Sequence, residues 1–174
     1  MAIKTIIIEP NKTLRQISKP VISVDKEERQ LMDDMLETMY SANGIGLAAI
    51  QIGVPKRIIV IDISKNDEKK NPIYFVNPLI KNKNSEHSTY EEGCLSVPNY
   101  FAEINRPKKC DVEYLDYNGE KQLLEAEGLL ATCIQHEMDH LEGILFIDYL
   151  SKLKKTMIEK KLAKQKVRPD RIIV

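Results

Sequence analysis

Residues 128–143 of the chain read GLLATCIQHEMDHLEG, and this stretch decides the fold because its apolar residues fall on more than one side of a helix. A helix that is apolar nearly all round is buried inside a protein. His136 and His140 are four residues apart and therefore project from one face of that helix. Gly143 is a suitable end for it. The sequence thus predicts a buried central helix that carries a pair of imidazoles.

The pattern His-Glu-x-x-His on a helix is typical of two metal ligands with a carboxylate, here Glu137, beside the reacting water. A buried imidazole pair without partners would be costly, which favours a metal site over simple packing. A catalytic site of this kind needs a third protein ligand and one position left for water. The rest of the chain must supply that third ligand.

Several residues are candidates for the third ligand. Phe146 stands where metzincins would have a third histidine, so that class is excluded. A thermolysin-like site would use Glu159, but this residue lies among lysines that indicate a solvated face. Cys133 is one turn before His136 and fits packing better. Cys94 ranks first, because a glycine before it and a proline after it indicate a fixed bend that presents the thiol; a buried structural cysteine is the alternative.

Length and composition indicate one soluble globular domain with its own core: 174 residues, 43% hydrophobic and 30% charged. The formal net charge is zero, which gives no indication of DNA binding. The first residues have no apolar core of a signal peptide, and no apolar run approaches the roughly 18 residues that span a bilayer. Three cysteines are too few for a disulfide scaffold. We therefore expect a cytoplasmic protein that does not enter a membrane.

Charge is unevenly distributed along the chain. Residues 151–174 carry nine Lys or Arg against two acidic residues, a net charge of +7, which leaves −7 on residues 1–150. We predict a catalytic domain over residues 1–150 and a basic helical extension with a tail over residues 151–174. Its basic face is either simply solvated or docks on ribosomal RNA. The amphipathic helix expected here has the apolar positions Phe146, Leu150, Leu153, Met157, Ile158 and Leu162.

The remaining sequence predicts one more helix and several strands. Asp25 and Glu28 form a capping pattern before a stripe of methionines at helical spacing. Residues 44–53 are rich in Gly and Ala and predict a tightly packed strand rather than a phosphate loop. The fold class is α+β, with short mixed or antiparallel strands packed around the central helix. Strands are expected at 57–63, 73–80 (interrupted by Pro78), 86–91, 99–105, 111–117 and 120–126.

Three segments together resemble the three signature motifs of the peptide deformylases: GIGLAAIQ at 44–51, EGCLS at 92–96 and QHEMDH at 135–140. They occur in the family's order, and the resemblance extends over roughly residues 8–150. It implies an enzyme that removes the formyl group from the N-terminal methionine of nascent proteins. The C-terminal extension is similar to that of the common bacterial type.

The resemblance also implies roles for individual residues. Cys94, His136 and His140 would hold one divalent metal, usually Fe²⁺, although Ni²⁺, Co²⁺ and Zn²⁺ accept the same ligands. Glu137 would be the general base. Gln51 and the backbone amide of Leu95 would stabilise the oxyanion.

Substrate binding is expected along residues 44–53, where an edge strand would accept an extended peptide. Ile45, Gly46 and Leu47 would pair with the peptide backbone. The methionine pocket expected from spacing and resemblance is lined by Ile45, Leu129, Thr132 and Cys133.

One position departs from the family pattern. Many bacterial members carry an arginine near the pocket mouth where this chain has Phe101, which puts the details of peptide affinity in question. Arg106 nearby is expected to pair with an acidic residue such as Glu92.

Two other functions remain open from the residues alone. One is a His-Glu-x-x-His metallopeptidase. The other is a structural metal site without catalysis, in which Cys133 or Glu137 would complete a closed sphere of four ligands.

Overall fold

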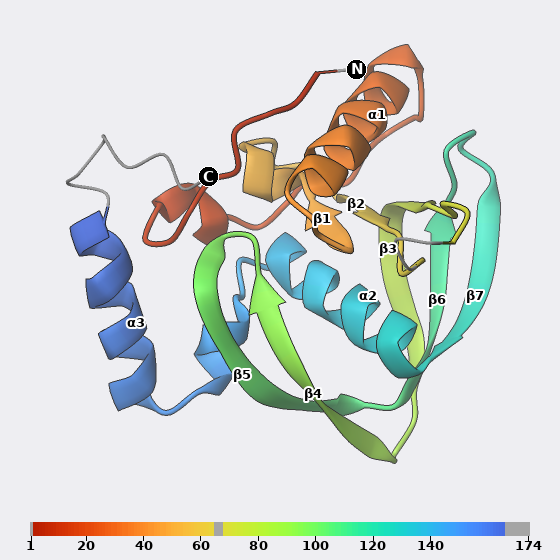
Figure 1. Ribbon diagram of the computed structural model, residues 1–174. Coiled ribbons are helices and arrows are strands. Elements are labelled where there is room, and N and C mark those ends of the chain that lie inside the picture. Colours follow the sequence, from red (N-terminus) through yellow and green to blue (C-terminus); the bar gives the residue numbers. More distant parts are fainter. Residues whose placement is uncertain (1, 65–67, 166–174) are drawn as a thin grey trace.

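The computed structural model describes residues 2–64 and 68–165. Its strands form two sheets, and one helix lies at the centre between them (Figure 1). The larger sheet contains β1 (Gly46–Ala48), β2 (Ile58–Ile61), β3 (Ile73–Lys83), β6 (Lys109–Leu115) and β7 (Lys121–Glu127). The smaller sheet is the hairpin of β4 (His87–Cys94) and β5 (Val97–Pro107). The helices are α1 (Lys26–Ser41), α2 (Gly128–Leu141) and α3 (Lys152–Gln165), with the 3-10 turns η1 (Lys12–Arg15), η2 (Ala49–Ile52) and η3 (Phe146–Tyr149).

The predicted α+β class is confirmed. The strand order of the larger sheet is β1-β2-β3-β6-β7, and all of its strand pairs are antiparallel. This order leaves β1 at one edge, as the resemblance implied for residues 44–53. Pro78 coincides with a shift of register between β3 and β6, and therefore sits at a bulge inside the sheet.

Strand β2 of the larger sheet is buried on both of its faces. In β2, Ile59 and Ile61 pack in the core shared with α2, whereas Ile58 and Val60 pack in the core shared with α1. This alternation follows from the two-residue period of a strand. The run of β-branched residues in β2 is apolar on both faces because a helix packs on each side of the strand.

Helix α1 begins where the sequence predicted. Asp25 is its N-cap, and the side chain of Glu28 closes the capping box. Met32, Met35 and Met39 are fully buried against the sheet, so the methionine stripe belongs to the core.

Helix α2 is the centre of the molecule. Its Ala131, Ile134 and Leu141 are fully buried in the core shared with the larger sheet. It also contacts β4 and β5 of the smaller sheet. The predicted all-round burial is confirmed except at the first turn, where Leu129 is exposed.

The single amphipathic helix predicted across residues 146–162 is wrong. Residues 146–149 form the separate turn η3, and α3 begins only at Lys152. The Ser151 hydroxyl accepts the Lys154 N–H, which is N-cap behaviour and explains where the new helix starts. Ile158 and Leu162 pack with β5 and η3, but Leu153 is 83% exposed.

The predicted tail lies outside the described residues, and the division at residue 150 stays a prediction. Of the helices in residues 2–64 and 68–165, none is long and apolar enough to cross a membrane.

Candidate metal centre and active site

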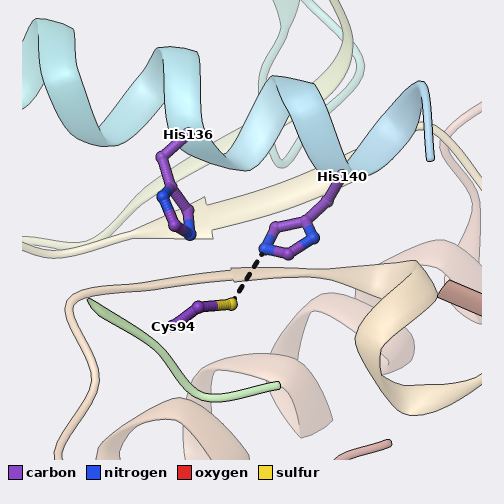
Figure 2. A group of neighbouring side chains, drawn as sticks. All are labelled: Cys94, His136 and His140. Carbon is purple, nitrogen blue, oxygen red and sulfur yellow. Dashed lines mark hydrogen bonds between the residues drawn. The ribbon is translucent and has the colours of Figure 1, made fainter. Parts of the chain in front are cut away.

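Three potential metal ligands from two elements meet beside α2. His136 and His140 project from one face of this helix, and Cys94 faces them from the end of β4 (Figure 2). Cys94 Sγ lies 3.3 Å from His140 Nε2. One donor atom from each of the three residues falls within 4.8 Å of the others. In the described part of the chain, this is the one group of histidines, cysteines and carboxylates with such spacing.

The chemistry of this donor set fits a divalent transition metal. One thiolate and two imidazoles are ligands that Fe²⁺, Co²⁺, Ni²⁺ and Zn²⁺ accept, and three protein ligands leave a position for a reactant. The other candidates for the third ligand are engaged elsewhere. Cys133 directs its thiol to the carbonyl of Ile45 at 3.8 Å. Glu159 on α3 lies 3.9 Å from both Arg15 and Lys155.

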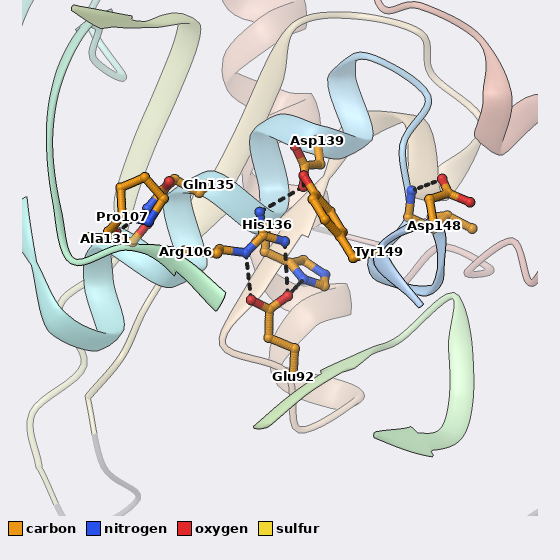
Figure 3. Close-up of polar contacts among 10 residues, drawn as sticks. Glu92, Arg106, Pro107, Ala131, Gln135, His136, Asp139, Asp148 and Tyr149 are labelled. Atoms are coloured by element: carbon orange, nitrogen blue, oxygen red, sulfur yellow. Dashed lines mark hydrogen bonds and ion pairs between the residues drawn. The ribbon is translucent and has the colours of Figure 1, made fainter. Parts of the chain in front are cut away.

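A buried ion pair orients His136 (Figure 3). His136 Nδ1 lies 2.8 Å from Glu92 Oε2. Arg106 donates to both oxygens of Glu92, at 2.6 and 3.0 Å, and to Asp139 Oδ2 at 2.8 Å. The predicted pair of Arg106 and Glu92 is therefore confirmed. Because Glu92 engages Nδ1, the Nε2 atom of His136 is left to bind a metal.

The two imidazoles have opposite protonation tendencies. Burial disfavours a charged His136, but hydrogen bonds to Cys94 and Glu92 outweigh burial and hold the pKa of His136 well above its usual value. Burial, reinforced by the charge of His136, holds the pKa of His140 well below its usual value. A metal ion requires both rings as neutral ligands, so its binding would release a proton.

Glu137 is buried on α2 beside this cluster, and its Oε2 atom has no hydrogen-bond partner among the described residues. Burial raises the pKa of Glu137 to about 7. A Cβ atom at Gly46 of β1 would collide with Oε1 of Glu137 and come within 2.9 Å of the Cys133 sulfur. Only glycine at position 46 therefore lets the strand pass this close to the carboxylate.

Gln51 and Leu95 both lie at the cluster. The Gln51 Oε1 atom accepts the Ala48 N–H at 2.8 Å, which orients the amide group. Its Nε2 atom donates to Ser96 Oγ at 3.1 Å and lies 3.6 Å from Cys94 Sγ. Leu95 lies in the turn between β4 and β5 and packs so closely on Gly44 that a Cβ atom there would be 2.7 Å from Leu95 Cδ1.

A cavity of about 480 Å³ opens over these groups. Leu47 is not among its lining residues, because the side chain is fully buried in the core shared with α1. The proposed pairing of the Leu47 backbone with substrate stays a prediction. The lining includes the predicted residues Gln51, Cys94, Leu95, His136, Glu137, Ile45, Gly46, Leu129, Thr132 and Cys133, and also Phe101.

Comparison with known proteins decides the family. The family model described as polypeptide deformylase matches residues 3–156. The chain belongs to the peptide deformylase family.

Known peptide deformylases match all or nearly all of the chain. The peptide deformylase of Pelagibacter ubique is 74% identical over 100% of both chains. That of Rhizobium meliloti is 58% identical over 94% of both. The crystal structure of peptide deformylase from Ehrlichia chaffeensis in complex with actinonin has a TM-score of 0.92 and 43% identity, covering 97% of this chain and 100% of that one.

Three residues around this peptide deformylase site were not recognised from the sequence. Glu92 was expected only as an ion-pair partner, but it also hydrogen-bonds His136. A signal was present, since Glu92 and Cys94 are two residues apart in a strand and so share a face. The Ser96 hydroxyl accepts a hydrogen bond from the Gln51 amide. The Tyr149 hydroxyl donates a hydrogen bond to Asp139 at 2.8 Å. No local pattern in the sequence indicates the contact of Tyr149.

Proposed function

We propose that this peptide deformylase removes the formyl group from the N-terminal methionine of newly made proteins, with Cys94, His136 and His140 holding one divalent metal. The observation that carries the proposal is the Glu137 carboxylate, which is buried beside those three donors at the cavity and whose Oε2 atom has no hydrogen-bond partner among the described residues. Bound there, a divalent metal supplies Lewis acidity that activates water near neutral pH. We propose Fe²⁺ as that metal, with Ni²⁺, Co²⁺ or Zn²⁺ able to replace it.

Glu137 would move the protons of the reaction. One of its oxygens takes a proton from the attacking water and later donates it to the amine nitrogen that leaves. Water adds to the formyl carbon, the carbon–nitrogen bond breaks, and formate and the free amine of methionine are released. In the part of the chain that the structure describes, Oε2 has no hydrogen-bond partner, which supports this role. A buried carboxylate oxygen without a partner is costly unless a reactant hydrogen-bonds to it.

Gln51 and Leu95 would stabilise the negative charge that develops on the formyl oxygen. The amide of Gln51 is held in place by Ala48 and Ser96, so its Nε2 donor is already oriented next to Cys94. The backbone N–H of Leu95 comes from the adjoining turn. Each such donor contributes about 3 kcal/mol to stabilising a transition state.

The edge strand β1 would bind the peptide. Among the described strands it pairs with β2 alone, and Gly46 brings it against Glu137. Main-chain hydrogen bonds to an edge strand give affinity without requiring particular side chains. Such binding suits a substrate that is defined by its first residue, whose side chain would enter the cavity between Ile45, Leu129, Thr132 and Cys133.

Formate release tests this function. Protein purified without oxygen and loaded with Fe²⁺ should release formate from formyl-Met-Ala-Ser, and Cys94→Ala should lower both bound metal and kcat/KM by about 100-fold or more. The control is Cys110→Ala, whose thiol is buried in the core of the larger sheet, and it should keep both.

Three outcomes would contradict the proposal. Fully metal-loaded protein that releases no formate would exclude the activity. Cleavage of an internal bond in an unblocked peptide would favour a metallopeptidase. A cobalt spectrum typical of four protein ligands would favour a structural site.

The C-terminal helix would contact the ribosome through its lysines. The buried side chains of Ile158 and Leu162 pack α3 against the rest of the protein. The lysines on its outer side are exposed: Lys160, Lys161 and Lys164. Replacing these three lysines by glutamate should weaken cosedimentation with ribosomes about tenfold or more at low salt, because phosphate contacts are lost. Formate release from short peptides should not change. Ribosome binding that is unaffected by the substitutions or by salt would argue against the contact.

A further inference from the structure

The N-terminal segment, residues 7–15, connects the two parts of the chain that carry the proposed oxyanion donors. The Ile7 N–H donates to the Gln51 carbonyl at 2.7 Å. The Glu9 N–H donates to the Ser96 carbonyl at 2.9 Å, and Ser96 directly follows Leu95 in the turn between β4 and β5. Main-chain hydrogen bonds of this segment therefore bridge η2 and the turn.

These hydrogen bonds form a ring with the side chain of Gln51. Its Nε2 atom donates to Ser96 Oγ at 3.1 Å, so η2 and the turn also contact each other directly. A shift of the N-terminal segment would change the separation of η2 from the turn, and with it the separation of the Gln51 amide from the Leu95 N–H. Such donors stabilise a developing charge only when they are oriented in advance. The position of the segment therefore bears on the oxyanion site.

An ion pair at a buried carboxylate fixes the segment, which runs from α1 toward α3 (Figure 1). Glu9 is only 4% exposed, and its Oε1 atom accepts a hydrogen bond from Arg15 Nη2 at 3.2 Å. The Nη1 atom of Arg15 donates to Asp148 Oδ2 of η3 at 2.6 Å. A Cβ atom at Gly143, just after α2, would lie 2.5 Å from the Arg15 carbonyl oxygen. Arg15 thus fastens the segment to η3 and to the end of α2.

Stability alone does not account for a carboxylate at position 9. Burial raises the pKa of Glu9, and Arg15 beside it opposes this shift without cancelling it. The Oε2 atom of Glu9 has no hydrogen-bond partner among the described residues. An apolar side chain of similar size would avoid the cost of burying this charge. The contact that Glu9 makes with Arg15 explains its presence better than stability does.

We propose that Glu9, held by Arg15, is a positioning residue for the deformylase reaction. It fixes the N-terminal segment so that the Gln51 amide and the Leu95 N–H are directed at one formyl oxygen. This inference rests on the proposed deformylase activity and adds a residue to it. Glu9 acts through the two donors and does not touch the substrate, because it is not among the residues that line the cavity.

Glu9→Met tests the role, because it removes the hydrogen-bond acceptor and nearly keeps the size of the side chain. With enzyme loaded with Fe²⁺, kcat for formate release from formyl-Met-Ala-Ser should fall about tenfold, whereas KM and bound metal should change less than about twofold. Glu9→Gln should keep kcat within about twofold, since its amide oxygen still accepts from Arg15. In the metal-free protein, hydrogen exchange at the Ile7 and Glu9 amides should be about tenfold faster in Glu9→Met.

A double-mutant cycle with Gln51→Ala separates positioning from general destabilisation. One donor is already absent in the Gln51→Ala enzyme, so Glu9→Met should lower its kcat only about twofold. Lys4→Met is the matched control. Lys4 precedes the segment and pairs with Asp34 of α1 at 3.1 Å, and neither residue lines the cavity. It should leave kcat unchanged in both backgrounds.

Three outcomes would overturn the role of Glu9 while the deformylase activity stands. They are an unchanged kcat in folded Glu9→Met, the same tenfold fall in both backgrounds, and a fall in bound metal that matches the fall in kcat. If Glu9→Met does not fold, Arg15→Lys replaces it, because one ammonium group cannot contact Glu9 and Asp148 through separate nitrogens. Its kcat should fall about threefold, and an unchanged kcat would overturn the role. No formate from the unmodified enzyme would overturn both proposals.

Discussion

Replacing Glu137 by glutamine is expected to lower kcat for formate release by about 10³-fold. Glutamine has nearly the same size, so it preserves the close contact with Gly46, but it cannot take a proton from water. The three candidate ligands are untouched, and bound metal should remain at one ion per chain. The loss should appear in kcat rather than in KM, because peptide binding to β1 does not involve the carboxylate.

Metal content and steady-state rates measured on the same preparation check this expectation. Glu125→Gln is a matched control, since Glu125 is an exposed carboxylate on β7, remote from the cavity lining. It should have the rate of the unmodified enzyme. A Glu137→Gln variant that binds metal and keeps more than a tenth of the activity would show that another group carries the proton.

Replacing Arg106 by methionine is expected to lower the free energy of unfolding by about 3–5 kcal/mol. The side chains of Arg106 and Glu92 are each only 5% exposed, and the arginine contacts both Glu92 and Asp139. Methionine would leave Glu92 buried with only His136 as a partner. Because His136 would then be oriented less firmly, metal affinity should also fall by about 10- to 100-fold.

A second substitution distinguishes a lost charge partner from a lost side chain. The pair Arg106→Met with Glu92→Met should recover part of the stability, since Glu92 is then no longer a buried charge without its arginine. It should not recover metal affinity, because His136 Nδ1 still lacks Glu92. Denaturant unfolding of the metal-free protein and competition with a chelator measure the two quantities separately.

The control for this series is an exposed ion pair. Lys109 and Glu127 lie 2.8 Å apart, with side chains 53% and 69% exposed. Lys109→Met should change stability little, because water and salt screen such pairs. If Arg106→Met lowered the free energy of unfolding as little as Lys109→Met, the buried ion pair would not be what stabilises the packing of the β4–β5 hairpin on α2.

Local periodicity accounts for what could be predicted from the sequence. Helix α2 with its two histidines, the capping box of α1, the buried strand β2 and the hairpin after β6 follow from spacings within a single turn or strand. Periodicity failed across residues 146–162, where one apolar spacing spans two elements. There the burial of Phe146 and the cap at Ser151 decided that η3 ends before α3 begins.

The sequence by itself predicted the central helix, all three candidate ligands with Cys94 ranked first as the third, the candidate general base Glu137 and, through three co-occurring motifs, the family. Only the tertiary structure decided that Cys94 meets His140, 46 residues further along the chain. It also decided that Glu92 contacts Nδ1 of His136. The physical reason is that backbone periodicity acts over a few residues. Contacts between α2 and the β4–β5 hairpin depend instead on how the two sheets pack around the helix.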